Sequence, residues 1–480
     1  MLPTLLGLIL FAIGLFLLFR KSIEAMVAFC FGCTLLGGGA AAVLPALGGA
    51  SIPPAYLGLA FAILRIFLPG GRQGRLVQDS LGANIFLLAF ASYGIVSAFI
   101  LPRIFAGDIN VVPLKPVGLR GMFGTTPLVF TSQNITASLS LVATALYAVV
   151  TYVACRQPRG AIMIVKAATV VAFIHVYLGV SASLLAGTPY SLFIDFFRNG
   201  SYYQYNQGIG GFARITGVWP EPSAYANFGF FWFVFACECW LRDIMPRRTG
   251  WAAFLMGLVL VVSTSSTAYA GLAAYLALFI VRMILFPHSL KFSKAAMLLA
   301  TTLAMAIGVC VLILFHPSLA KTLGDVLYAL TIEKGDSLSG QQRAFWAKQG
   351  VNAFFASKGL GIGVGSFRSS SLITAILGST GIIGSATLII FLLHVFKPGR
   401  MSTYVSRRNP VEDVGAAAGW TVIMSLFPLG VSWPTADPGY VFGIFCGIAL
   451  ALRAAPARVR ASRDVGRPAG VTPVAFEAAT

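Results

Sequence analysis

Charged residues are scarce in this sequence, and acidic ones are the scarcest. Only 10% of the 480 residues are charged, and Asp and Glu together number 15, whereas soluble domains average about 25% charged residues. This scarcity excludes a soluble globular protein. With 58% hydrophobic residues, the chain has the composition of an integral membrane protein.

Histidine and cysteine are also few, and neither forms a metal or disulfide pattern. The seven cysteines all lie in or beside apolar runs, so Cys30-x-x-Cys33 and Cys237-x-Cys239 are interpreted as packed membrane thiols rather than redox or zinc pairs. His175 stands in the middle of an apolar run with no second histidine placed to join it. We interpret it as a helix-to-helix hydrogen-bonding residue. Because the acids near predicted spans, Glu24, Glu238 and Asp243, lie towards cytoplasmic ends, the sequence also argues against an ion-coupled pump, whose membrane interior usually carries several paired charges.

Long apolar runs are abundant and recur from end to end. Each has about 18 to 25 residues, enough to cross about 30 Å of hydrocarbon as a helix. They predict an all-α polytopic membrane protein with about 13 transmembrane helices (12 to 14), the first retained rather than cleaved as a signal peptide. The predicted spans lie near 3–19, 25–47, 53–69, 81–101, 134–155, 161–187, 222–241, 250–265, 267–286, 295–315, 372–396, 414–432 and 439–452.

Basic residues set the predicted orientation, because lysine and arginine stay cytoplasmic. Most of the 34 lysines and arginines fall in short loops on one side. Three longer loops, 102–133, 188–221 and 316–371, then face outward, and the last should carry short helices. The sequence thus predicts a single transmembrane domain, 1–452, and a basic disordered cytoplasmic tail, 453–480. The net charge of +19 reflects this topology and contact with anionic lipid, not nucleic-acid binding.

The last outer loop has the clearest local signals. Ser339-x-x-Gln342 resembles a capping box and predicts a helix that stops before Gly359. Arg343 and Gly350 fall on one stripe of that helix. Small residues on the stripe would let another backbone approach closely, which would place Arg343 in a packed crevice.

A glycine-rich segment, "GLGIGVGSFRSSS", follows that helix. Its glycines at 359, 361, 363 and 365 suit close backbone approach or positive φ angles. The spacing differs from G-x-G-x-x-G, and no strand precedes it, which argues against a dinucleotide site. Two interpretations stay open: a turn leading into the next span, or an anion-binding nest.

Positive charge on the disfavoured outer side indicates an anion to be held there. The paired donors of arginine match phosphate oxygens better than lysine does. Arg214 and Arg343 are therefore the predicted first pair, with Arg368 as a third member or alternatively a rim charge. The outer basic residues include Arg198, Arg214, Arg343, Lys348, Lys358 and Arg368.

An acidic residue lies between two prolines in "RITGVWPEPSAYANFGF". Proline disfavours a helical conformation in the residue before it, so Trp219 and Glu221 should be extended and Pro222 should open the next helix. Glu221 is then either an N-capping acid or a carboxylate aimed at reactants. Downstream, the hydroxyls at 263–267 would satisfy backbone groups where two helices join, or else would recognise sugar hydroxyls.

Taken in order, these motifs resemble the O-antigen ligase and polymerase superfamily. The resemblance spans 214–384 and implies a GT-C-like bundle in the bacterial inner membrane whose active site faces the periplasm. Such enzymes take a saccharide from an undecaprenyl diphosphate carrier and need no metal or other cofactor. The matching residues are Arg214-x-x-Gly217, Pro220-Glu221-Pro222-Ser223, the hydroxyls at 263–267, Arg343 with Trp346, Gly361-x-Gly363-x-Gly365-Ser366-Phe367 and Gly381-Ile382-Ile383-Gly384.

The resemblance implies one of two transfers, to another lipid-linked repeat by a polymerase or to lipid A core by a ligase. Ligases of the family carry a histidine-asparagine pair shortly before the glycine matching Gly381, where this chain reads Arg368-Ser369-Ser370-Ser371. This departure favours an inverting polymerase of exopolysaccharide, capsule or O-antigen. The alternatives are a ligase and, in a different class, a transporter or flippase of lipid-linked sugars.

The predicted site follows from the same resemblance. Arg214 and Arg343 correspond to the family arginines that hold the diphosphate. The departure at 368–371 leaves the base unassigned by the resemblance, and Glu221 is the candidate for that role. The expected partners are undecaprenyl-diphosphate-linked oligosaccharides, membrane lipids, and chain-length or export proteins. The predicted substrate-binding residues are Arg368, Tyr225, Gly363, Gly365 and Ser366.

Overall fold

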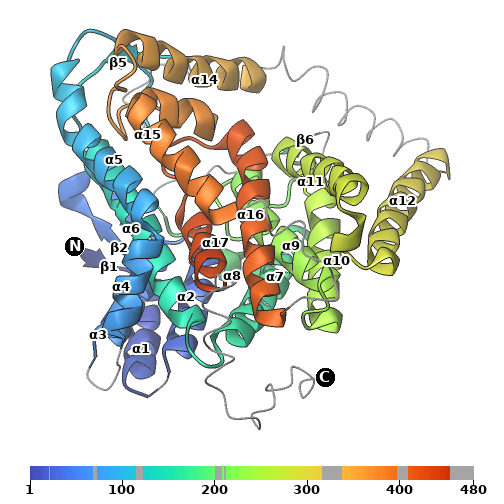
Figure 1. Ribbon diagram of the computed structural model, residues 1–480. Coiled ribbons are helices and arrows are strands. Elements are labelled where there is room, and N and C mark those ends of the chain that lie inside the picture. Colours follow the sequence, from blue (N-terminus) through green and yellow to red (C-terminus); the bar gives the residue numbers. More distant parts are fainter. Residues whose placement is uncertain are drawn as a thin grey trace.

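The computed structural model describes the chain in eight stretches, and within them it is almost wholly helical (Figure 1). The described residues are 1–20, 22–68, 73–114, 123–200, 208–209, 212–315, 338–396 and 409–453. The helices are α1 (Leu5–Arg20), α2 (Ile23–Thr34), α3 (Pro54–Phe67), α4 (Gly74–Ala83), α5 (Ile85–Ile104), α6 (Ser132–Cys155), α7 (Gly160–Leu184), α8 (Tyr190–Phe196), α9 (Pro222–Leu241), α10 (Pro246–Val262), α11 (Ser266–Leu285), α12 (Phe292–Phe315), α14 (Leu338–Ala356), α15 (Leu372–Phe396), α16 (Pro410–Ser432) and α17 (Tyr440–Ala451).

Seven described helices are long and apolar enough to cross a membrane: α5, α6, α7, α9, α11, α15 and α16. They confirm a helical multi-pass membrane protein. Every predicted span overlaps a helix. The count of about 13 crossings stays a prediction, because α1, α2, α3 and α17 are shorter than the about 20 residues that a straight crossing needs.

The span predicted at 25–47 runs past the end of the helix by more than three helical turns, since α2 ends at Thr34. Three glycines follow, and two of them touch the segment before α9. A Cβ on Gly37 would meet the Trp219 ring, and one on Gly38 would meet the Val218 carbonyl oxygen. The chain leaves the helix here because only glycine permits this close packing.

Short antiparallel strands occupy several of the connections. One three-stranded sheet has the order β1 (Leu2–Pro3), β2 (Ala42–Leu44), β3 (Ala50–Ile52), with Val43 opposite both Leu2 and Ser51. Two further pairs fall in predicted outer loops. They are β4 (Asn110–Val111) with β5 (Thr126–Pro127), and β6 (Gly208–Ile209) with β7 (Phe212–Ala213). Short 3₁₀ turns complete the connections at η1 (Pro45–Leu47) and η2 (Pro287–Ser289).

Of the seven long apolar helices, the most enclosed is α9, which packs against α7, α10, α11 and α16. As the sequence predicts, α9 begins at Pro222, and Glu221 before it is extended, with φ −154° and ψ 156°. Because α9 is held by four neighbours, its first residue and the acid before it are fixed relative to the rest of the bundle.

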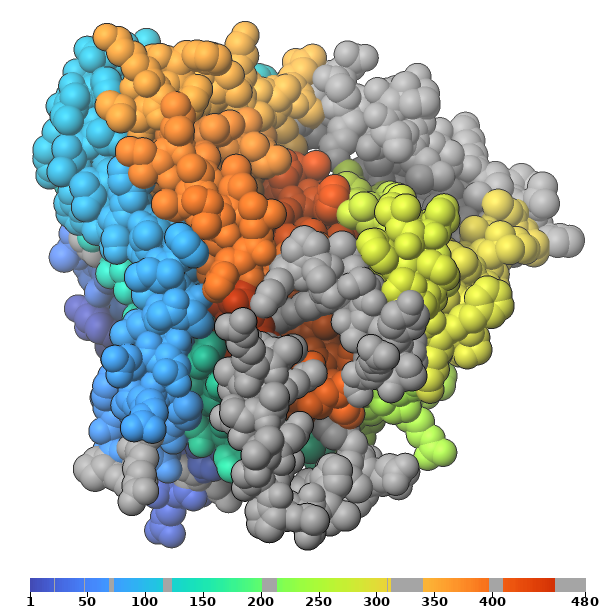
Figure 2. All heavy atoms as spheres, in the orientation of Figure 1, coloured from blue at the N-terminus to red at the C-terminus, as the bar shows by residue number. Residues whose placement is uncertain are grey.

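The helix predicted in the last outer loop is α14, which lies along the upper edge of the molecule in Figure 1 and against α15. It ends at Ala356, before Gly359 as predicted. It begins at Leu338, so Ser339 lies inside the helix and the predicted cap there is wrong. Figure 2 shows α14 and α15, in orange, beside the blue α5.

A close backbone contact joins α14 to α15. A Cβ on Gly350 would meet the carbonyl oxygen of Thr374, so no larger residue fits at this helix crossing. This confirms the close approach predicted from the stripe that Arg343 and Gly350 share. Farther along, α15 is kinked at Gly381, whose φ is 58°.

Candidate functional site

The segment that carries Arg214 and Glu221 is held by backbone and side-chain hydrogen bonds. Arg198 donates from Nε to the Gly217 carbonyl at 2.9 Å and from Nη2 to the Thr216 hydroxyl at 3.1 Å. On the other side, the Gly38 N–H donates to the Val218 carbonyl at 3.0 Å. Arg198 therefore positions this segment.

Arg214 and Arg343, from two different predicted outer loops, lie close enough to affect each other. Burial, followed by the positive charge of Arg343, lowers the pKa of the Arg214 guanidinium. Burial also lowers the pKa of Arg343, and the charge of Arg368 adds to this effect. Both Arg214 and Arg343 stay protonated at neutral pH. The structure thus brings together the three arginines predicted from sequence, at a cost in mutual repulsion.

Arg368 is held both through its side chain and through its backbone. Its guanidinium carbon lies 4.3 Å from the centroid of the Trp346 ring on α14, a cation–π geometry. Its backbone N–H donates to the Val112 carbonyl at 2.8 Å, which joins this segment to the first predicted outer loop. The neighbouring Ser370 hydroxyl donates to the Arg343 carbonyl at 2.6 Å.

Glu221 lies among these arginines and is not an N-cap in the usual sense. It has the N-cap position of α9, but its side chain accepts no capping hydrogen bond. Its negative charge raises the pKa of both Arg214 and Arg343. Within the described residues, no direct ion pair joins it to either arginine. Three guanidiniums and one carboxylate leave two net positive charges.

Several buried polar atoms near this cluster have no hydrogen-bond partner in the described part of the chain. Buried polar groups are nearly always paired, so such a concentration indicates a place where a polar molecule binds. The atoms are Arg214 Nε, Trp219 Nε1, Trp346 Nε1, Gln349 Oε1 and Arg368 Nε.

The glycine-rich segment behaves as a packing element. All four glycines at 359, 361, 363 and 365 have positive φ angles, between 83° and 95°. Three of its central amides are engaged by the protein itself, which leaves these three unavailable for an anion nest: Gly361 donates to Ser357 Oγ at 2.8 Å, Ile362 to the Gly378 carbonyl at 2.8 Å and Gly363 to the Ser379 carbonyl at 3.0 Å.

Substrate binding by Gly363, Gly365 and Ser366 stays a prediction. Ser366 is buried, and its hydroxyl donates to the Ile362 carbonyl at 2.8 Å while accepting from the Asn134 amide at 3.0 Å. These contacts tie the segment to α6. A purely structural role accounts for all of them.

Tyr225 is fully buried inside the bundle. Its hydroxyl donates to the His175 carbonyl at 3.1 Å, and the two rings stack with centroids 3.9 Å apart. His175 does join α7 to α9, but through its backbone and ring face rather than through Nε2, which has no partner among the described residues. A substrate contact for Tyr225 stays a prediction.

An apolar groove opens beside the segment that runs from Arg214 to Glu221. It has a volume of about 650 Å³ and lies between α2, α7 and α8. Three of its lining residues, Leu36, Leu178 and Phe197, pack in one cluster with Val218 and Trp219. The groove therefore reaches the segment that runs from Arg214 to Glu221.

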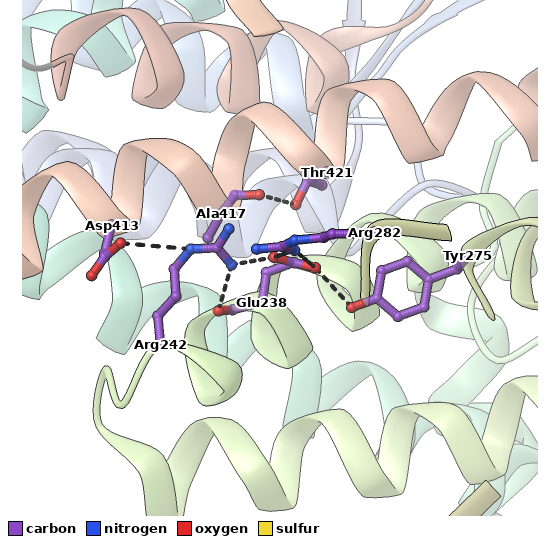
Figure 3. A network of polar contacts seen from close by, with 7 residues as sticks. All are labelled: Glu238, Arg242, Tyr275, Arg282, Asp413, Ala417 and Thr421. Atoms are coloured by element: carbon purple, nitrogen blue, oxygen red, sulfur yellow. Dashed lines mark hydrogen bonds and ion pairs between the residues drawn. The ribbon is translucent and has the colours of Figure 1, made fainter. Parts of the chain in front are cut away.

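A second charged cluster, not expected from the sequence, lies inside the bundle (Figure 3). The Glu238 carboxylate pairs with Arg242, accepts from Arg282 Nη1 at 3.0 Å and accepts from the Tyr275 hydroxyl at 3.0 Å. Arg242 also lies 3.7 Å from Asp413. The cluster joins α9, α11 and α16, and its charges balance. The i, i+4 spacing of Glu238 and Arg242 was visible in the sequence, but the partners on other helices were not.

Asp437, in the connection between α16 and α17, was also missed. It is buried, accepts from the Thr144 hydroxyl at 2.8 Å and accepts from the Gly439 N–H at 3.1 Å. Burial raises its pKa from 3.8 to about 6. The same connection reaches the arginine cluster, since the Ser369 N–H donates to the Pro434 carbonyl at 3.0 Å.

Across the stretches that the structure describes, no three His, Cys, Asp or Glu side chains gather as metal ligands would. The polar side chains that do gather are arginines and one glutamate, which suit an anionic ligand. Comparison with known protein families and with curated proteins finds no match for this chain.

Proposed function

We propose that the protein is a glycosyltransferase that polymerises undecaprenyl-diphosphate-linked oligosaccharide repeats at the periplasmic face of the bacterial inner membrane. The observation that carries the proposal is that Arg214 and Arg343 lie within electrostatic range of each other and of Glu221, while Arg368 lies within range of Arg343, beside Ser370, whose hydroxyl donates to the Arg343 carbonyl. The two net positive charges of these arginines and Glu221 match a diphosphate diester, which carries one negative charge on each phosphate. Arginine forks supply the bidentate geometry that phosphate oxygens accept.

In this proposal the arginines act on the leaving group. The bond between the sugar anomeric carbon and the diphosphate oxygen breaks, and its electron pair stays on that oxygen. Arg214 and Arg343 stabilise the charge that develops there, where fixed donors are most effective. Stacking on Trp346 fixes the Arg368 guanidinium as a third donor.

Glu221 acts on the acceptor. The non-reducing-end hydroxyl of the incoming repeat attacks the anomeric carbon from the opposite side, which inverts its configuration, and the proton passes to the Glu221 carboxylate. Two observations support this role. The carboxylate is not used as a helix cap, and it lies within electrostatic range of both arginines.

The apolar groove supports a lipid-linked substrate. Its lining is formed almost entirely by leucine, isoleucine and aromatic side chains. A prenyl chain lying there would have its diphosphate end directed towards the segment from Arg214 to Glu221, because Trp219 borders both features.

Purified protein incubated with lipid-linked repeats tests the function. Elongation without any other acceptor is the expected result. If product forms only when lipid A core is added, the protein is a ligase. If repeats are never joined but cross the bilayer of a proteoliposome, it is a transporter and the proposal is wrong.

Arg343→Ala should reduce polymer formation by about 100-fold or more, because removing one fixed donor to a developing anion typically costs 10²–10³ in rate. Lys348→Ala is the matched control, since Lys348 is exposed on the same helix, and it should keep nearly full activity. Normal elongation by a well-folded Arg343→Ala protein would contradict the diphosphate role.

A further inference from the structure

The junction between α10 and α11 lies beside Arg214. Ile215 packs with Val259 near the end of α10. On α11, Tyr269 raises the pKa of Arg214 by its electrostatic interaction. The packing of Ile215 on Val259 places the residue after Arg214 against the end of α10, and the Tyr269 hydroxyl on the first turn of α11 donates to the Val261 carbonyl there at 2.9 Å.

Only part of the hydroxyl-rich stretch at this junction serves the backbone. Ser263 donates from its hydroxyl to the Leu260 carbonyl at 2.7 Å, which is the structural role expected from the sequence. Ser265 and Thr267 differ. Both are 1% exposed, yet neither hydroxyl has a partner within the described residues.

The helix start itself is uncapped. Ser265 occupies the N-cap position of α11 in an extended conformation, with φ −107° and ψ 120°, but it makes no side-chain capping bond. Serine is among the best N-cap residues. When its hydroxyl accepts no capping bond, the N–H groups of the first helical turn have no side-chain acceptor. Such amides, together with the helix dipole, favour an anion.

We propose that the first turn of α11, with the Ser265 and Thr267 hydroxyls, is a second wall of the anion site and binds a phosphoryl oxygen on the side opposite Arg343. This inference rests on the proposed function and names the part of the protein that holds the phosphate together with Arg214. Four groups then point to one ligand: two unpaired hydroxyls, the unpaired Arg214 Nε and an uncapped helix start.

The probe is inorganic pyrophosphate, titrated calorimetrically into the full-length protein in detergent. Thr267→Val keeps the volume and branching of the side chain, and Ser265→Ala removes one oxygen. Each should weaken binding about tenfold, the typical effect of losing a hydrogen bond to a charged group. Ser263→Ala is the matched control, because its hydroxyl already has a partner, and it should bind pyrophosphate like the wild type.

The outcomes separate this inference from the proposed function. If both variants melt at the wild-type temperature and bind pyrophosphate as tightly as the wild type, while Arg214→Ala binding is lost, the second wall is refuted and the arginine site stands. If the wild type itself binds no pyrophosphate, both ideas fail. An equal loss of binding in Ser263→Ala would also overturn the inference, since it would reduce the effect to general disturbance of the junction.

Discussion

At the scale of single residues, Glu221 combines a structural position with an unused side chain. It sits where an N-cap belongs but leaves its carboxylate free of capping bonds, close to two arginines. A residue placed in this way contributes little to helix stability. Its carboxylate therefore remains available to interact with a charged group or to accept a proton.

Glu221→Gln should therefore slow polymerisation by about 100-fold, the usual contribution of a general base, and leave the melting temperature nearly unchanged. Initial rates on lipid-linked repeats and a thermal melt measure the two quantities. A variant that turns over normally would show that departure of the diphosphate dominates the barrier. A variant with a much lower melting temperature would show that Glu221 has a structural role.

Asp437 gives a residue-scale prediction about pH. Its pKa is raised to about 6 in the folded protein, so the folded state binds a proton more readily than the unfolded chain does. Stability from this group is full below about pH 4 and falls as pH rises to about 6, by about 3 kcal/mol.

Asp437→Asn should remove that slope, because asparagine stays neutral and its Oδ1 can still accept from Thr144 and Gly439. Melting temperatures between pH 4 and 7 compare the two proteins. The tyrosines that face this carboxyl, Tyr56 and Tyr440, titrate far above this range in water, near pH 10. If the melting temperatures of the wild type and of Asp437→Asn changed with pH in the same way, the prediction would be refuted.

At the scale of elements, the contact between α14 and α15 determines where Arg343 lies. Gly350 is two turns from Arg343 on α14 and touches the Thr374 backbone on α15. Ser370 at the start of α15 also holds the Arg343 carbonyl. Any increase in helix separation must therefore move the guanidinium.

Gly350→Ala should reduce activity at least tenfold even though Arg343 is intact, because an active-site group displaced by about 1 Å can cost 10²-fold. Gly308→Ala on α12 is the control: its added Cβ meets nothing within 4 Å, and alanine favours helix. Full activity in Gly350→Ala would show that α14 can shift without affecting the site.

At the scale of the whole molecule, the cluster centred on Glu238 joins α9 to α11 through the Glu238 carboxylate and to α16 through the pair of Arg242 with Asp413. α9, which carries this residue at one end, carries Glu221 at the other, so the cluster anchors the helix that presents the proposed site. Losing the carboxylate would leave Arg282 buried without its acidic partner, and Arg242 with Asp413 alone.

Glu238→Gln should lower the free energy of unfolding by about 3–5 kcal/mol, as breaking a buried ion pair does. Asp243→Asn is the control, because its bonds to Lys291 and Lys294, at 2.6 and 2.5 Å, join half-exposed groups and exposed pairs contribute about 0–1 kcal/mol. Thermal or denaturant unfolding in detergent measures both. Equal shifts in the two variants would contradict a special role for the buried cluster.

Helix positions followed well from the sequence, because an apolar run of sufficient length has one stable form in lipid. The early end of α2 did not, since Gly37 and Gly38 are needed only for contact with a segment about 180 residues away. Local geometry was similarly readable at Glu221, where flanking prolines restrict the backbone. The cap predicted at Ser339 failed by a small shift of the helix start.

By itself, the sequence determined a helical multi-pass membrane protein, the extended backbone at Glu221 and an excess of arginine in a few loops, because each depends on composition or on neighbouring residues. Only the tertiary structure decided that Arg214 and Arg343 lie near that acid with Arg368 beside Arg343, that amides of the glycine-rich segment bond to α15, and that Glu238 and Asp437 are buried. The physical reason is that charge and burial depend on distances between residues far apart in the chain, which helix packing alone sets.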